Sequence, residues 1–187
     1  MNNKVKFNIK NLHYAVKLAE GGYGMPVAIP GAVSISLEAQ GEVSPFYADG
    51  IKYYVTSSNG GYEGDVEIAL IPDQFRKDVL QEVEDANKVL IENSNTESVE
   101  FALGFDIDGD QKTTRLWFFN CIATRPSTKS QTNEATKTPI TDTITISCTP
   151  GSNGNIRAKT TAATTESVYN DWYKSVYTTQ AEAQGGE

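Results

Sequence analysis

Residues 101–122 read FALGFDIDGDQKTTRLWFFNCI, and this stretch decides the fold class. An apolar run of strand length stands at each end of it. Between the runs, Asp108-Gly109 favours a two-residue hairpin turn, because such turns need residues that tolerate a left-handed backbone. The stretch therefore predicts an antiparallel hairpin. Residues 116–119 are apolar on both faces, so we expect the second strand to be central or covered by a helix.

The same alternation of apolar and polar residues recurs on both sides of this hairpin. It predicts further strands, each following a Gly, Pro or Asp signal for a turn or a polar tract: 33–37, 51–55, 66–70 and 144–148. In the first 18 residues the alternation slips by one position near Asn11, which predicts a bulge or a tight turn. The chain is therefore expected to be mainly β.

Two segments have the spacing of a helix. Residues 73–83 begin after Pro72, which is tolerated at the start of a helix. Their apolar residues recur at helical spacing: Phe75, Val79 and Leu80. Residues 168–177 also fit a helix, with Trp172 on its apolar stripe, but their β-branched and aromatic residues suit a strand equally well.

Two connections are longer than loops usually are in a compact domain. One is the polar tract 127–142, and the other is residues 40–64, which are rich in Gly and Ser. The second contains four neighbouring aromatic residues: Phe46, Tyr47, Tyr53 and Tyr54. They fit a lid over the core or a surface for partners, and the interleaved charges and glycines favour the surface. We interpret 1–187 as one domain, with these two loops and a C-terminal arm from about residue 160.

The charge of the chain is negative and unevenly distributed. Its formal net charge is −8, and residues 63–110 hold 14 of the 24 acids with only three bases. This balance argues against a protein that grips nucleic acid, because such proteins neutralise phosphates with Lys and Arg. It remains compatible with a protein past which nucleic acid must slide.

No stretch has the roughly 20 apolar residues of a membrane span, and the first residues do not resemble a signal peptide. We therefore expect a protein made and kept in the cytosol, without a membrane partner. Cys121 and Cys148 lie in strand-like runs and lack the spacing of metal ligands. In a reducing cytosol they are expected to be buried free thiols rather than a disulfide.

The sequence offers little catalytic chemistry. Asp106, Asp108 and Asp110 alternate like calcium ligands, but Gly109 is at the fourth position of such a loop and Trp117 occupies the twelfth. An acidic hairpin tip is favoured instead. His13 is the only histidine, and no nucleophile motif accompanies it. A pair of glycosidase carboxylates has no sequence signature. We expect no catalytic residue, no metal and no cofactor.

Several short motifs together resemble the major tail tube proteins of long, non-contractile-tailed bacteriophages that infect Gram-positive hosts. They are KVKF at 4–7, PVAIPG at 26–31, PFYAD at 45–49, GYEGD at 61–65, IALIPD at 68–73, ATRP at 123–126, KTT at 159–161 and YNDWY at 169–173. Each motif alone is weak, but their combination and order cover nearly the whole chain.

The resemblance implies a β-sandwich or barrel-like subunit with a helix packed outside, in a virion tail assembled in the host cytoplasm. Such subunits form six-fold rings that stack into a tube, through which DNA and the tape-measure protein pass without specific binding. Tail terminator and distal tail proteins would meet the tube ends. Subunit contacts are expected from Phe46, Tyr47, Tyr53, Tyr54, Lys129, Lys137, Trp172 and Tyr177. Acids expected to line the lumen are Glu63, Asp65, Glu67, Asp106, Asp108 and Asp110.

A different class also fits the sequence: a β-sandwich module that binds carbohydrate or cells. Exposed aromatics such as Tyr53, Tyr54 and Trp172 would then form the sugar platform. Such a module should stay monomeric and bind glycans, whereas a tube protein should polymerise. The inner tube of a contractile secretion apparatus is a third interpretation.

The tract 127–142 is predicted to become ordered only against a neighbouring subunit. It is almost devoid of apolar side chains, so it cannot offset an ordering entropy of about 1 to 2 kcal/mol per residue. Replacing it with a short Gly-Ser linker should leave a folded subunit that no longer forms tubes in electron micrographs. Normal polymerisation of the shortened protein would refute this prediction.

Overall fold

The computed structural model of the protein describes residues 2–132 and 138–179, and strands dominate it, which confirms the mainly β prediction. Its largest sheet has eight strands in the order β2-β1-β9-β10-β11-β6-β3, with β12 also pairing with β10. Their bounds are β1 (Lys6–Val16), β2 (Val27–Ala28), β3 (Ala32–Gln40), β6 (Gly61–Ile68), β9 (Phe101–Gly109), β10 (Thr114–Ala123), β11 (Asp142–Cys148) and β12 (Arg157–Lys159). Two further hairpins pair β4 (Val43–Ala48) with β5 (Ile51–Ser57), and β7 (Val83–Glu84) with β8 (Leu90–Ile91).

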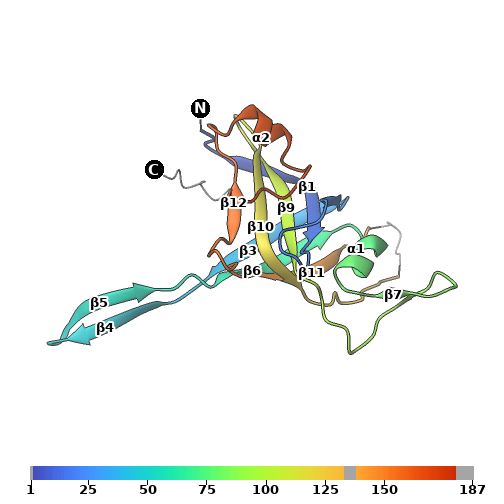
Figure 1. Cartoon of the computed structure of the whole chain (residues 1–187), viewed down its shortest axis with the longest axis horizontal. Coiled ribbons are helices and arrows are strands. Elements are labelled where there is room, and N and C mark those ends of the chain that lie inside the picture. Colours follow the sequence, from blue (N-terminus) through green and yellow to red (C-terminus); the bar gives the residue numbers. More distant parts are fainter. Residues whose placement is uncertain (1, 133–137, 180–187) are drawn as a thin grey trace.

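The large sheet consists of two halves that cross each other. Figure 1 shows β1, β9 and β10 running steeply across β3, β6 and β11. Only the last three residues of β10 pair with β11, as Cys121↔Cys148, Ile122↔Ser147 and Ala123↔Ile146. Asn120, immediately before them, has a left-handed backbone with φ of 47°. The sheet therefore changes direction within β10 and encloses a core between its halves.

The main core is made by the inward side chains of both halves. These residues include Leu12, Leu103, Phe105, Phe118, Val66, Ile68, Ile144 and Ile146. The helix α1 (Asp73–Asp78) closes one side of this core. Its Phe75 packs edge-on against the rings of Tyr14 and Phe101, at centroid distances of 5.1 and 5.7 Å. The apolar stripe predicted for this helix is therefore buried, as expected.

A second, smaller core covers the opposite face of β9 and β10. It contains Trp117 and Phe119, together with Trp172 and Val176 from the segment that follows α2 (Glu166–Asn170). The indole N–H of Trp117 donates to the backbone oxygen of Trp172 at 3.1 Å. Gly104 lies opposite the Trp117 ring, where an added Cβ would come within 2.6 Å of it. Of the two alternatives predicted for this strand, the central position is confirmed, because β10 is interior in its sheet. Its outer face is covered by the segment after α2 rather than by a helix.

A buried acid further ties the C-terminal segment to the sheet. Asp106 is 1% exposed and accepts hydrogen bonds from the Tyr173 hydroxyl at 2.6 Å and the Asn11 amide at 2.8 Å. Arg115, its cross-strand partner, lies beside it and under the ring of Tyr169. Residues 160–179 therefore lie on the body of their own subunit, whereas the sequence predicted an arm beginning near residue 160.

The predicted irregularity near Asn11 is present. Asn11 has φ of 52°, and the register between β1 and β9 shifts between Lys10 and His13. This irregularity shifts the inward–outward alternation of side chains in β1 by one residue, so Leu12 and Tyr14 both point into the core.

Two local predictions are wrong in their extent. The helix expected over 73–83 ends at Asp78, because Gln81 is left-handed and its amide donates to the Asp78 backbone oxygen at 2.8 Å. The turn expected at Asp108-Gly109 lies instead at residues 110–113, after β9 has ended at Gly109. There the side chain of Asn3 accepts hydrogen bonds from two turn N–H groups, so tertiary contacts decide this turn.

Gly61 is a position where the fold requires glycine. It has φ of +105°, and an added Cβ would lie 2.0 Å from the backbone oxygen of Cys148. We predict that Gly61→Ala lowers the free energy of unfolding by about 2 to 4 kcal/mol, measured by chemical denaturation. The matched control is Gly154→Ala, which has φ of +76° and open space around the added methyl group, and should cost only about 1 kcal/mol. Equal losses in the two variants would contradict the proposed clash.

Candidate assembly surfaces

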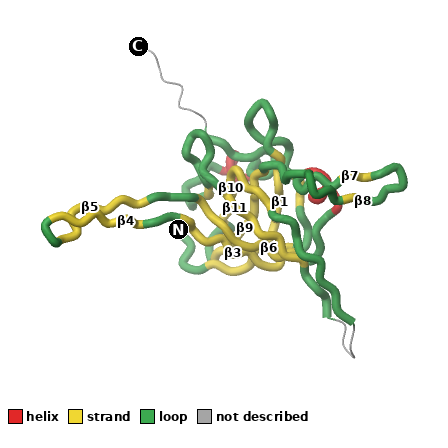
Figure 2. Tube along the Cα trace, turned by 90° about the horizontal axis from the view of Figure 1, so that it is seen from below, coloured by secondary structure: helices red, strands yellow, loops and turns green. Residues whose placement is uncertain are grey.

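The segment that the sequence presented as a long loop, residues 40–64, contains a projecting β-hairpin. The strands β4 and β5 pair from Val43↔Ser57 to Ala48↔Ile51 around Asp49-Gly50. Both turn residues have positive φ, 52° and 75°, as a two-residue primed turn requires. Figures 1 and 2 show this hairpin, which we call the arm (residues 43–57), extending far from the body of the subunit.

The arm continues the ladder formed by β3 and β6. The chain runs from β3 through Gly41 into β4, and returns from β5 through Gly60 into β6. Backbone hydrogen bonds bridge the junction, from Ser58 N–H to the Glu42 oxygen at 2.9 Å and from Gly60 N–H to the Gln40 oxygen at 2.7 Å. Because its base is hydrogen-bonded into the main sheet, the arm has a defined direction away from its own core.

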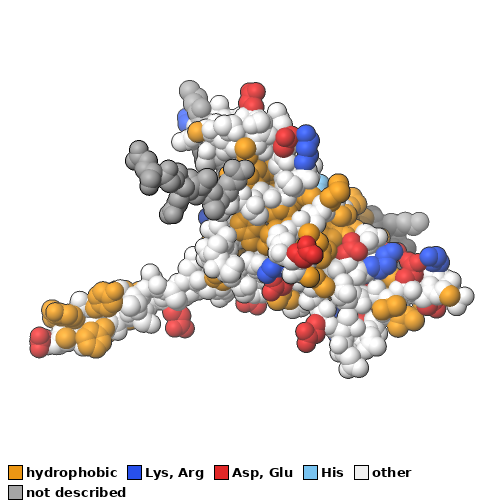
Figure 3. Space-filling view, in the orientation of Figure 1, with side chains coloured by type: hydrophobic (Ala, Val, Ile, Leu, Met, Phe, Trp, Pro, Cys, Tyr) orange, Lys and Arg blue, Asp and Glu red, His pale blue; other side chains and the backbone are white. Residues whose placement is uncertain are grey.

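Both faces of the arm carry apolar side chains. Cross-strand pairs share a face, so Phe46 lies with Tyr54 on one side and Pro45 lies with Val55 on the other. The seven large apolar residues are 44–69% exposed: Val43, Phe46, Tyr47, Ile51, Tyr53, Tyr54 and Val55. Hydrophobic side chains gather toward the far end of the arm (Figure 3), whereas Val43 lies at its root. The four aromatics predicted to contact partners are therefore on one protruding element, and all are accessible.

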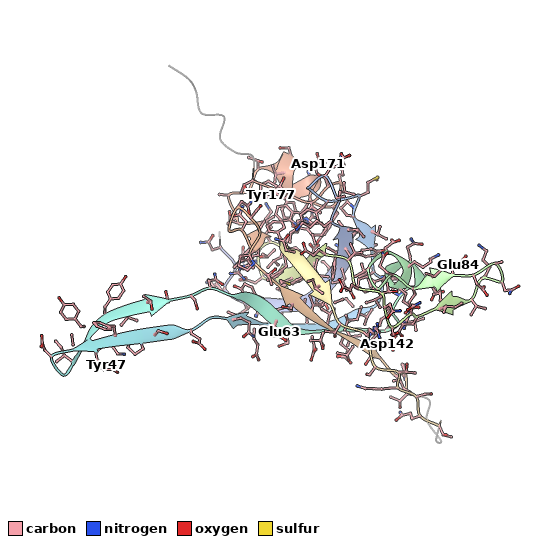
Figure 4. The ribbon with its side chains drawn as sticks, turned by 60° about the horizontal axis from the view of Figure 1, so that its bottom comes forward. Tyr47, Glu63, Glu84, Asp142, Asp171 and Tyr177 are labelled. Carbon is pink, nitrogen blue, oxygen red and sulfur yellow. The ribbon has the colours of Figure 1, made fainter. Side chains whose placement is uncertain are left out.

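The outward side of the half-sheet β3-β6-β11 has a different character. Three rows of cross-strand neighbours lie on it, Ser34-Glu67-Thr143, Ser36-Asp65-Thr145 and Glu38-Glu63-Ser147. We call these nine side chains the acid–hydroxyl face. Each is exposed or half-buried, while the residues between them point into the main core. Figure 4 shows Glu63 on this part of the sheet and Tyr47 near the far end of the arm.

Hydrogen bonds organise the acid–hydroxyl face. Glu67 accepts from the hydroxyls of Thr141 at 2.5 Å and Ser34 at 2.8 Å, and these bonds hold the pKa of Glu67 below its usual range. Asp65 accepts from the hydroxyl of Thr145 at 2.7 Å. None of the nine side chains is basic. The face therefore presents anionic and hydroxyl groups, with Glu67 ionised at neutral pH.

The acids predicted to act together are in two separate places. Glu63, Asp65 and Glu67 share the acid–hydroxyl face, whereas the other three belong to β9 and its turn. Asp106 is buried among its partners, so the prediction that it faces a lumen is wrong for this subunit. Asp108 contacts Lys10 at 2.6 Å, which lowers the pKa of Asp108.

Asp110 accepts a hydrogen bond from the backbone N–H of Lys4, which lowers its pKa. The carboxylates of the calcium-like motif are thus each engaged by a different protein group. Within residues 2–132 and 138–179, no group of three or more His, Cys, Asp or Glu side chains is arranged to hold a metal ion. His13, in β1, stacks on the Tyr173 ring at 4.2 Å.

The remaining predicted contact residues also differ in their placement. Trp172 is 3% exposed and belongs to the second core, so its prediction as an exposed contact is wrong. Tyr177 stacks on Trp172 at 5.3 Å between centroids and remains 40% exposed. Lys129 is exposed in a segment without regular secondary structure. Lys137 lies outside the described residues.

Sequence patterns missed two elements of these surfaces. The polar partners of the acids on β3 and β11 were present in the alternation, but the alternation does not show which strands are neighbours. The strand β3 has one ladder partner, β6, and ends the sheet order. Its other edge carries no strand among the described residues, and such an edge is a template for pairing with another chain.

Comparisons with known proteins add little. No protein-family model matches the sequence, and no curated protein matches it. One solved structure, the anti-feeding prophage cap (AFP tube terminating cap) determined by cryo-EM, aligns with a TM-score of 0.43 and 9% identity. The alignment covers 87% of this chain and 97% of that chain. A similarity of this size carries no argument about the function of the chain.

In the part of the chain that the structure describes, no helix has the length and apolar character to cross a membrane.

The acid–hydroxyl face should repel duplex DNA because its acids are gathered on one surface. We predict that the double variant Glu63→Lys, Asp65→Lys binds DNA at low salt with at least about tenfold higher affinity than the unmodified protein, and loses that affinity as salt rises. The control Glu20→Lys, Glu97→Lys makes the same charge change at two exposed, separated positions and should bind more weakly. Fluorescence anisotropy measures both, and equal binding would show that the position of the acids is irrelevant.

Proposed function

We propose that the protein is a structural subunit that polymerises through its arm into stacked six-fold rings, forming a phage-type tail tube. The observation that carries the proposal is the arm itself, a two-stranded ribbon with apolar side chains on both faces. An isolated two-stranded hairpin is marginally stable in water. A second surface that covers these side chains gives the arm the packing that residues 2–132 and 138–179 of its own chain do not provide.

The energy available from covering the arm is large enough for assembly. Burying one large apolar side chain contributes about 1.5 to 3 kcal/mol, and seven such residues are exposed on the arm. Ordering and association oppose this gain, so only part of it appears as affinity. The same contact is repeated at every subunit. This repetition offsets the cost of ordering and association, because a subunit that is already in place positions the next one.

A second copy of the chain is the partner that fits best. The arm points away from its own body and can reach a different surface of a copy. A contact between two different surfaces is heterologous, and repeated heterologous contacts generate rings or filaments. The free edge of β3 lies at the root of the same ribbon. In such a tube, strands would pair at the β3 edge within each ring, and the arm would contact the next ring. This arrangement agrees with the sequence resemblance.

The acid–hydroxyl face is proposed to line the lumen. A channel for DNA must not hold phosphates, and a surface of carboxylates and hydroxyls without bases repels them. The tape-measure protein and DNA would pass along it without specific binding. Tail terminator and distal tail proteins would occupy the two ends of the tube, in a virion tail assembled in the host cytoplasm. No enzymatic activity is included in the proposal.

The alternative of a carbohydrate-binding module is weakened by the structure. Trp172, one of the three aromatics assigned to a sugar platform, is buried in the second core of its own chain. The other two, Tyr53 and Tyr54, are on the projecting ribbon rather than on the body of the sheet. An unmodified protein that stays monomeric in sedimentation and binds glycans in a separate binding assay would favour this alternative.

Polymerisation should depend on the apolar side chains of the arm. The double variant Phe46→Ser, Tyr54→Ser removes two exposed rings from one face, so its thermal unfolding midpoint should change by less than about 3 °C. The fraction of protein in rings or tubes, measured by sedimentation and negative-stain microscopy, should fall at least about tenfold. The control Phe46→Tyr, Tyr54→Phe retains both rings and should assemble normally. Normal tubes from the serine variant would exclude the arm as the assembly element.

A further inference from the structure

Cys121 and Cys148 are brought together by the fold although 27 residues separate them in the sequence. They are directly opposite each other at the junction of β10 and β11. Both are fully buried, and their Sγ atoms are in contact at 2.8 Å as free thiols. The assembly surfaces described above use neither of them.

The hydrogen bonds around this pair identify its type. The N–H of Thr149 donates to the Asn120 oxygen at 3.2 Å, and the N–H of Thr124 donates to the Thr145 oxygen at 2.9 Å. In an antiparallel ladder, hydrogen-bonded and non-hydrogen-bonded pairs alternate, so Cys121 and Cys148 form a non-hydrogen-bonded pair. Such pairs bring their Cα atoms to about 4.5 Å, which is within the range that a disulfide spans.

The pair also lies at the short joint between the two halves of the sheet. Three residue pairs connect β10 to β11, whereas seven connect β11 to β6. The two halves of the sheet, and with them the acid–hydroxyl face and the root of the arm, are joined along the sheet through these three pairs. A covalent bond at this joint would tie the two halves together.

We propose that Cys121 and Cys148 are a site of oxidative cross-linking, at which a thiol oxidant converts the folded subunit to a form with one intramolecular, cross-strand disulfide. Two S–H bonds break and one S–S bond forms, while two electrons and two protons pass to the oxidant. With an azo compound such as diamide, the N=N bond takes them up and becomes a hydrazine.

The structure also indicates when the bond forms. Burial raises the pKa of the Cys121 thiol, so little reactive thiolate is present in the folded protein. Cys148, however, is the last residue of β11, so loss of the adjacent hydrogen bond from Thr149 to Asn120 would be enough to open the strand end to an oxidant. The pair therefore stays reduced in a reducing cytosol during assembly and is oxidised slowly afterwards. A particle that leaves its host would gain a covalent joint after it has been built.

The test uses the full-length purified protein, incubated with diamide under native conditions. Remaining thiols are then alkylated in denaturant, and the protein is digested without reductant for mass spectrometry. We expect a peptide pair joining Cys121 to Cys148 with two hydrogens lost, and a thermal unfolding midpoint raised by about 5 to 10 °C. Reductant should reverse both effects. Two thiols that remain fully alkylatable, a disulfide only between separate chains, or a lowered midpoint would each overturn the proposal.

Substitutions separate the cross-link from general effects of the oxidant. Cys148→Ala should show no rise of the midpoint with diamide and no loss of hydrogens. If that variant does not fold, Cys121→Val in the same assay takes its place, because valine keeps the strand propensity and the apolar character of the site. A midpoint that rises in a folded single-cysteine variant would also overturn the proposal, since the effect would then not come from this bond.

Discussion

The burial of β10 on both faces is the constraint on which the rest of the structure depends. Phe118 points into the main core, and its neighbour Trp117 points into the second core on the opposite side of the sheet. One strand thus requires two covering layers. The crossing half-sheet with α1 provides the first, and the C-terminal segment provides the second. Without either layer, a row of large apolar side chains in the centre of the sheet would face water.

In the described part of the chain, this arrangement leaves no layer over the arm. The inward side chains of β3 and β6 are used by the main core, and the ladder that they form simply continues outward past Gly41 and Gly60. The arm is apolar on both faces like a buried strand, yet no layer formed by residues 2–132 and 138–179 covers it. One continuous ribbon therefore carries two surfaces of opposite chemistry. The arm exposes aromatic side chains, whereas the outer face of the half-sheet is polar and acidic. A protein that assembles needs one surface that binds its neighbours and another that remains in contact with solvent.

Much of the fold was accessible from local patterns, and the failures have physical causes. Period-two alternation located the main strands, and the slip at Asn11 correctly indicated an irregular register. The turn after β9 was misplaced because the side chain of Asn3, remote in the sequence, stabilises residues 110–113. Asp106 was assigned to the lumen as one of the acids concentrated in residues 63–110, but Asn11 and Tyr173 hydrogen-bond to it inside the protein. The exposed or buried state of such residues depends on partners that local patterns do not contain.

The sequence by itself determined most of the long strands, the start of the apolar helix and the concentration of acids, because these follow from side-chain periodicity and composition. Only the tertiary structure decided which faces find a covering layer. It buried Trp172 while leaving Tyr54 exposed, although both are aromatic residues in segments of comparable pattern. It also placed Cys121 opposite Cys148 and gathered Glu63, Asp65 and Glu67 beside the hydroxyls of two other strands. The physical reason is that burial and contact are properties of pairs of segments, and strand pairing between distant residues decides which pairs meet.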